Sequence, residues 1–199
     1  MRREPFEVAT AEARACQVCA NLLPHAPNPI LQGSSQARIQ IISQAPGTRA
    51  HASGKPFMDP SGVRLRDWLQ LDEAAFYDPA NVAITPMGMC FPGLDSKGGD
   101  RPPRPECAPI WQDRLRAALP EVRCTLLIGA YAQRRWLGAR AEKTLTATVL
   151  RWRDFAPEIF ALPHPSWRNN AWLKRNPWFE KEVLPALRLR IRSILGREL

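Results

Sequence analysis

A histidine beside a proline stands at the end of an apolar segment, where its ring could donate a hydrogen bond to a ligand. His164 follows the strand-like residues 158–162, and Pro165 after it restricts the local backbone. Phe57 lies in an otherwise polar loop, where an aromatic ring could stack on a planar ligand. Gly47, earlier in that loop, permits unusual backbone dihedrals that turn N–H groups toward a ligand. The histidine and the aromatic residue also have structural interpretations, as a capping or buried histidine and a core aromatic.

Four of the five cysteines are spaced in a way that is compatible with a metal centre. Cys16 and Cys19 form a CxxC pair, which presents two thiolates from one tight turn to a metal or forms a redox dithiol. A redox pair usually follows a strand and opens a helix, whereas this pair follows a helical pattern. Cys124 lies in the apolar run CTLLIGA and is expected in the core. The scattered ligands Cys16, Cys19, Cys90 and Cys107 suit an iron–sulfur cluster, with zinc or unliganded thiols as the alternatives.

The charge balance indicates a polyanionic partner, with nucleic acid first. The 28 Lys and Arg residues exceed the 19 Asp and Glu residues by nine, and the pI is about 10.0. A basic surface without such a partner is the alternative. No apolar run approaches the roughly 18 residues that span a bilayer, so no membrane association is expected. The first residues contain no apolar signal region, and the cysteine content does not suggest a disulfide scaffold, so we expect a cytoplasmic protein.

Apolar strand patterns alternate with helical patterns along the chain. Strands are predicted at 38–43, 82–85, 124–129 and 158–162. Helices are predicted at 4–15, 61–71 with Ser61 as N-cap, 106–119, 130–137 and from about Pro177 onward, whereas 142–150 is ambiguous. This alternation predicts a three-layer α/β/α sandwich with a central, mostly parallel four-stranded sheet, formed by a single domain over residues 1–199.

Loops after the predicted strands are expected to hold the functional site. The segments 44–62 and 163–170 each follow a strand, and the carboxyl ends of parallel strands meet at one edge of a sheet. Loops as long as 44–62 are usually functional. The basic residues of 188–197 are expected to form a solvated face of the last helix.

The order of these motifs resembles the uracil-DNA glycosylase superfamily, most closely its iron–sulfur family 4 enzymes. The resemblance is carried by the CxxC pair, by QAPG (44–47), GKPF (54–57) and SG (61–62), by the two later cysteines and by HPS (164–166). It covers about residues 10–190. It implies a [4Fe-4S] cluster held by Cys16, Cys19, Cys90 and Cys107, which ties the N-terminal helix to the 90–107 loop without taking part in a redox step.

The resemblance also implies a monofunctional DNA glycosylase, an N-glycosyl hydrolase of base excision repair. The target base is flipped into a pocket, where Phe57 stacks on it and Ala45 and Gly47 contribute to base binding. His164 stabilises the charge that develops on the O2 oxygen of the leaving uracil, helped by the loop that begins at Gln44. Action as a monomer on DNA that contains uracil or another deaminated base is expected.

The chain departs from the family pattern at several positions. Gln44 replaces a glutamate, and Ala50 and His51 replace an acidic pair, so this loop offers no carboxylate to activate water. His51 is the titratable substitute, and we hypothesise that it orients the water or contacts a DNA phosphate. Pro86 replaces the asparagine that reads uracil. Asp59 is a further polar candidate.

The segment after HPS is expected to contact DNA. It interleaves aromatic, polar and basic side chains, which suits stacking and phosphate contact, at Ser166, Trp167, Arg168, Asn169 and Lys174. Residues 165–199 hold eight Lys or Arg against three Glu, hence five of the nine net positive charges.

Two other functions remain open from the sequence. A catalytically weak or inactive relative that binds DNA or damaged bases is the main alternative, because of the changes at Gln44, Ala50 and Pro86. An electron-carrying iron–sulfur protein is the other. The alternatives differ in their requirements, since a glycosylase needs His164 and Phe57, and a DNA-binding protein needs only the basic loop.

Overall fold

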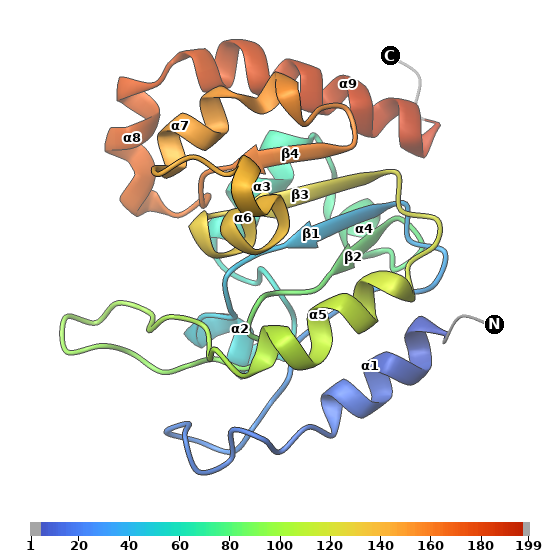
Figure 1. The fold of residues 1–199 in the computed structure, drawn as a ribbon, viewed down its shortest axis with the longest axis vertical. Coiled ribbons are helices and arrows are strands. Elements are labelled where there is room, and N and C mark those ends of the chain that lie inside the picture. Colours follow the sequence, from blue (N-terminus) through green and yellow to red (C-terminus); the bar gives the residue numbers. More distant parts are fainter. Residues whose placement is uncertain (1–4, 197–199) are drawn as a thin grey trace.

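A four-stranded parallel sheet forms the centre of the molecule (Figure 1). The structure, a computed structural model, describes residues 5–196. The strand order is β2-β1-β3-β4, and every neighbouring pair is parallel. The strands are β1 (Ile39–Ile42), β2 (Val82–Ile84), β3 (Cys124–Ile128) and β4 (Ile159–Leu162). All four strands lie within the predicted ranges.

Helices cover both faces of the sheet, which confirms the predicted three-layer α/β/α sandwich. The α-helices are α1 (Phe6–Arg14), α2 (Thr48–Ser53), α3 (Pro60–Leu69), α4 (Glu73–Tyr77), α5 (Cys107–Ala117), α6 (Ala130–Leu137), α7 (Leu145–Leu150), α8 (Asn170–Arg175) and α9 (Leu184–Leu195). Short 3-10 turns lie at Gly138–Arg140, Trp152–Asp154 and Trp167–Asn169, and a π-helical turn at Phe179–Val183 leads into α9. The helices α1, α5 and α6 lie on one face, and α3, α4 and α9 lie on the other (Figure 1).

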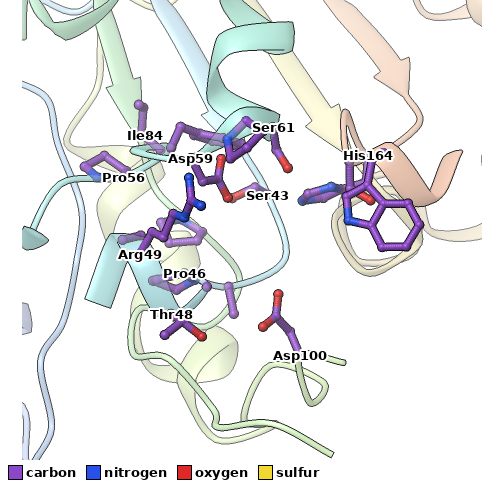
Figure 2. Close-up of a pocket in the computed structure, with 18 of the residues that line it drawn as sticks. Ser43, Pro46, Thr48, Arg49, Pro56, Asp59, Ser61, Ile84, Asp100 and His164 are labelled. Atoms are coloured by element: carbon purple, nitrogen blue, oxygen red, sulfur yellow. The ribbon is translucent and has the colours of Figure 1, made fainter. Parts of the chain in front are cut away.

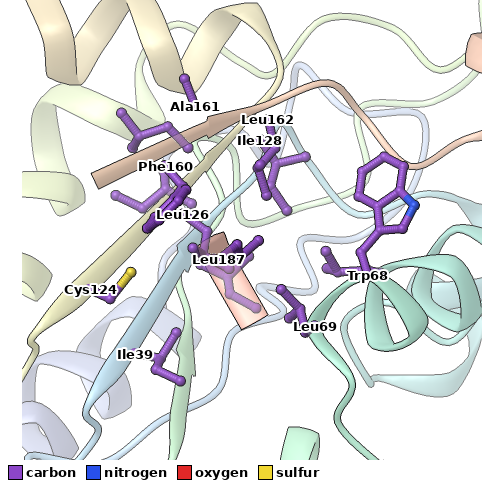
Figure 3. Packing of buried hydrophobic residues seen from close by; sticks show 14 of the residues in the cluster. Ile39, Trp68, Leu69, Cys124, Leu126, Ile128, Phe160, Ala161, Leu162 and Leu187 are labelled. Carbon is purple, nitrogen blue, oxygen red and sulfur yellow. The ribbon is translucent and has the colours of Figure 1, made fainter. Parts of the chain in front are cut away.

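The strands are mostly apolar, as expected of a parallel sheet whose two faces are both covered. All residues of β1, β2 and β3 are buried. Figure 3 shows Leu126 and Ile39 of the sheet with Leu187 of α9 and Trp68 of α3 in the larger core cluster. Cys124 has no exposed surface, which confirms its prediction as a core residue.

Several predicted boundaries were wrong for local reasons. Asp59, and not Ser61, is the N-cap of α3, because its carboxylate accepts the N–H of Gly62 at 2.8 Å and Pro60 fits the first turn. The 44–62 loop contains the short helix α2, and the ambiguous 142–150 segment contains α7, capped by Thr144. Helix α4 was not predicted. The start of the predicted 4–15 helix, at residue 4, lies outside the described residues.

The basic residues that were predicted to form a solvated face over 188–197 are partly exposed in α9, and two of them also bond to neighbouring segments. Ile191 and Ile194 are buried in the core. The Arg188 guanidinium donates to the backbone carbonyls of Asp67 and Trp68, and that of Arg190 donates to the carbonyl of Arg123. The basic side chains therefore attach α9 to its neighbours. Residue 197 lies outside the described residues.

The outer side of β2 is covered by a short antiparallel contact with Gln32. The backbone N–H groups of Gln32 and Ile84 each donate to the carbonyl of the other, at 3.0 and 2.8 Å. The side-chain amide of Gln32 also donates to the carbonyls of Phe76 and Val82. In the part of the chain described, no helix has the length and apolar character needed to cross a membrane.

Candidate active site

A cavity of about 330 Å³ opens at the carboxyl ends of the strands. Four parts of the chain supply its lining: the β1 loop with the start of α2 (43–50), the segment 56–61, the end of β2 with Asp100 from the loop after it, and the 164–168 segment after β4. Figure 2 shows Asp59, Asp100 and His164 around this space, with Arg49 and Pro46 at its border. The cavity therefore lies at the edge of the sheet where parallel strands usually present a site.

Phe57 lines the cavity from a strained and strongly held backbone. Its φ of 57° lies in the left-handed region, which is rare for a bulky residue and is typical of functional sites. The hydroxyl of Tyr77 is a hydrogen-bond donor to two backbone carbonyls, that of Pro56 at 3.0 Å and that of Phe57 at 3.2 Å. Gly62 has no room for a side chain, because an added Cβ would lie 1.8 Å from the carbonyl oxygen of Phe57. Phe57 as a whole is 8% exposed, and its ring packs edge-on against Phe76.

His164 is held at the end of β4, and its burial favours the uncharged imidazole. The side-chain amide of Asn169 donates to its backbone carbonyl at 2.7 Å. Burial lowers the pKa of the His164 imidazole, and the negative charge of Asp59 opposes this only in part. A neutral imidazole presents one N–H donor, which suits stabilisation of an anion that forms nearby.

Two carboxylates face the same cavity and differ in their contacts. The charge of Asp59 acts on the His164 imidazole and raises its pKa. The Asp59 carboxylate also accepts the N–H of Gly62 as the N-cap of α3. Within the described residues, the Asp100 carboxyl has no hydrogen bond or ion pair, and an added Cβ at Gly47 would lie 3.4 Å from one of its oxygens. Desolvation, with smaller contributions from Asp59 and Asp95, raises the pKa of Asp100, and Arg168 opposes this.

Two buried glutamines donate hydrogen bonds to backbone carbonyls at or near the ends of the strands. The side-chain amide of Gln112 donates to the carbonyls of Thr85 and Pro86, at the end of β2. The amide of Gln133 likewise donates to the carbonyls of Leu127 and Leu162, in β3 and β4. Because unpaired carbonyls are costly in a core, these amides fix the backbone from which the cavity-lining segments start.

The structure brings together most of the residues predicted from the sequence, but not all. Ala45, Gly47, Phe57, His164, Ser166, Trp167 and Arg168 line the cavity. Gln44, His51, Asn169 and Lys174 are not among the lining residues. The ring of His51 packs against His25 and Phe91 instead, with centroids 4.0 and 5.7 Å away, and burial together with the charge of His25 lowers its pKa.

Three contributors were missed by the sequence analysis. Arg49 lines the cavity from α2, and Asp100 lines it from the loop after β2. Arg64 of α3 supports the site from outside, because its guanidinium donates to the carbonyl of Ser166 at 3.1 Å. Arg49 lay in the loop already suspected of function. No signal in the sequence distinguished Asp100 or Arg64.

The four candidate ligand cysteines line a second, smaller cavity together. Cys16 and Cys19 follow α1, Cys90 follows β2 and Cys107 opens α5. Burial raises the pKa of Cys107 to about 12, and each of the other three thiols adds to this shift. The N–H of Met89 donates to the Cys107 sulfur at 3.4 Å. Among residues 5–196, no three His, Cys, Asp or Glu side chains are arranged as ligands of one ion.

The donor set of this second cavity fits an iron–sulfur cluster. Four thiols from three segments of the chain meet there, and apolar residues such as Trp111 and Ile110 complete the wall. The four thiols are partly buried, and thiols with a backbone N–H donor close by are ligands that proteins give to such clusters.

The comparison with known families agrees with the geometry of the larger cavity. A family model of the uracil DNA glycosylase superfamily matches residues 31–188, which is well over half of the sequence. The matched part begins before β1 and ends within α9, and it contains all the residues that line the larger cavity. The chain belongs to the uracil DNA glycosylase superfamily.

Proposed function

We propose that this protein is a monofunctional DNA glycosylase that removes uracil, or another deaminated base, in base excision repair. The observation that carries the proposal is the meeting of Phe57 and His164 in one cavity at the strand ends. An aromatic ring and a neutral hydrogen-bond donor are what a flipped base and its departing anion require. The superfamily match supports the same class of reaction.

In the proposed reaction, water replaces the base on the sugar. The bond between C1′ and the base nitrogen breaks, and its electron pair leaves with the base. His164 donates a hydrogen bond to the O2 oxygen on which negative charge develops, and the backbone around Gly47 borders the base. The water oxygen bonds to C1′, and its proton passes to Asp59, which lines the cavity close enough for its charge to act on His164. Asp59 thereby supplies the carboxylate that the 44–51 loop lacks.

The mouth of the cavity supplies cations and an aromatic ring for DNA. Trp167 is 69% exposed beside the cavity, and Arg49 borders it from α2. Arg168 lies near the 95–100 turn, where its guanidinium contacts the carbonyl of Gly98 at 3.4 Å. We assign Arg49 and Arg168 to phosphate contact and Trp167 to stacking on the duplex next to the flipped base.

We also propose that Cys16, Cys19, Cys90 and Cys107 hold a [4Fe-4S] cluster, as in the iron–sulfur family 4 enzymes, with zinc as the alternative. The cluster would have a structural role, because none of these thiols lines the larger cavity. Protein purified without oxygen should be brown, with broad absorbance near 400 nm, and contain about four iron and four sulfide per chain. A colourless protein with one zinc per chain would refute the cluster.

A glycosylase assay tests the main proposal. Labelled single- and double-stranded oligonucleotides that carry one uracil, hypoxanthine or xanthine are incubated with the protein and then treated with alkali, which cuts abasic sites. We expect cleavage by the wild type and a loss of at least a hundredfold in His164→Ala. His25→Gln, which changes a histidine outside the cavity, is the matched control. Binding of DNA without cleavage at any of these bases would favour the non-catalytic relative, to which Pro86 in the cavity wall also points.

A further inference from the structure

Pro86 lines the cavity just after β2, but its side chain cannot form a hydrogen bond with a base. The loop that follows this strand comes back to the same cavity at Asp100. Figure 2 shows the Asp100 carboxyl directed into the space between Asp59, Ser43 and His164. A hydrogen-bond acceptor is therefore presented to the cavity by the segment that begins at Pro86.

The loop holds Asp100 in place by its own hydrogen bonds. Leu94 and Asp100 pair in an antiparallel bridge, and the N–H of Arg101 donates to the carbonyl of Gly93 at 2.9 Å. Asp95 closes the tip, because one of its carboxylate oxygens accepts the N–H groups of Lys97 and Gly99 at 2.8 Å. The position of Asp100 is thus set by the turn and leaves its carboxyl available.

The charges around Asp100 favour a ligand that donates a hydrogen bond. Arg168, Asp59 and Asp95 are the charged groups that act on it, and the two negative charges and desolvation outweigh the guanidinium, so that its pKa is raised. A base that enters the cavity removes further water from this carboxylate. An N–H group on the base would replace the lost water, whereas an acceptor nitrogen would leave the carboxylate unpaired.

Deamination of a base converts an acceptor nitrogen of its ring into an N–H donor. Cytosine N3 and adenine N1 are acceptors, and in uracil and hypoxanthine the same ring positions carry a hydrogen. We propose that Asp100 is a specificity-determining residue, whose carboxylate accepts the ring N–H of the flipped base. This inference rests on the proposed glycosylase function and identifies the atom through which that site selects its substrate.

The test compares excision of uracil with excision of cytosine and of N3-methyluracil, which lacks the ring N–H. The wild type should prefer uracil over both. In Asp100→Ala the preference for uracil over N3-methyluracil should fall at least tenfold, because the acceptor is lost and the methyl group gains space. Asp100→Asn keeps an acceptor oxygen and should retain uracil excision within a fewfold. Its amide can also turn an N–H toward cytosine N3, so its discrimination against cytosine should fall.

Asp95→Asn is the matched control, because it changes a carboxylate of the same loop that is absent from the cavity lining and keeps the oxygen of the turn. Equal excision of uracil and N3-methyluracil by the wild type would overturn the inference about Asp100 and leave the proposed glycosylase function intact. An equal loss on every base in Asp100→Ala, with unchanged preference, would also overturn it. Absence of excision by the wild type on any base would refute the proposed function and this inference together.

Discussion

The larger cavity and the cysteine cavity are both built from loops, but they are held in different ways. Buried amides of Gln112 and Gln133 fix the strand ends behind the larger cavity. The cysteine cavity lies outside the sheet, and its Cys90 and Cys107 stand at the two ends of the loop that carries Asp100. The sheet therefore positions the segments that carry the proposed reacting groups, whereas the loop that we assign to selectivity is held by its own turn and lies between two of the proposed cluster ligands.

Among the substitutions that test this comparison, removal of the Asp59 charge should give the largest effect, and it separates chemistry from folding. Asp59→Asn should lower single-turnover excision about a hundredfold, a usual range for loss of an acid–base group. Its stability should change little, because asparagine is also a good N-cap. The Asp59 charge raises the pKa of His164 against burial, so its loss should lower that pKa and move the acid limb of the pH–rate profile to lower pH. A shift of the limb to higher pH would contradict the assigned pair.

Substitution at the cysteine cavity should affect stability and selectivity more than turnover. Cys107→Ser should lose iron and solubility, and the fraction that stays folded should still excise uracil with a weaker preference over N3-methyluracil. Cys124→Ser is the control, because its buried hydroxyl should cost about 1–3 kcal/mol of stability and leave iron content unchanged. Iron analysis, thermal melting and the excision assay measure these effects. If Cys107→Ser were folded and free of iron but had no turnover at all, the cysteine cavity would be needed for the chemistry itself, which contradicts the separate roles given to the two cavities.

Loss of one hydroxyl should give the smallest effect. Tyr77→Phe removes the donor to the carbonyls of Pro56 and Phe57 and keeps the ring. We expect kcat/KM to fall about three- to tenfold, with a loss of about 1 kcal/mol in stability, as for one hydrogen bond. Unchanged kcat/KM would show that Gly62 and Phe76 suffice to hold the Phe57 backbone.

The sheet was predictable because its strands are short apolar runs bounded by turn residues. The helix α3 was predicted, but the close approach of its Gly62 to the Phe57 carbonyl and the left-handed backbone of Phe57 were not. They depend on tertiary contacts, including Tyr77 of the unpredicted helix α4. His51 was expected to orient the water or contact a DNA phosphate because of its place in the motif, but the short helix α2 directs it toward His25 and Phe91. Asp100 was missed because its loop returns to the cavity through turns that the Pro/Gly-rich sequence does not specify.

The contact of Gln32 with β2 bears on how the protein behaves at high concentration. A sheet edge with free N–H and C=O groups can pair with the edge of another molecule and start aggregation. On β2, a strand of only three residues, Gln32 pairs with the backbone of Ile84, and its side chain takes the carbonyl of Val82. This residue therefore acts against intermolecular strand pairing. A variant such as Gln32→Pro would expose that edge and should precipitate on gentle warming, before the core itself unfolds.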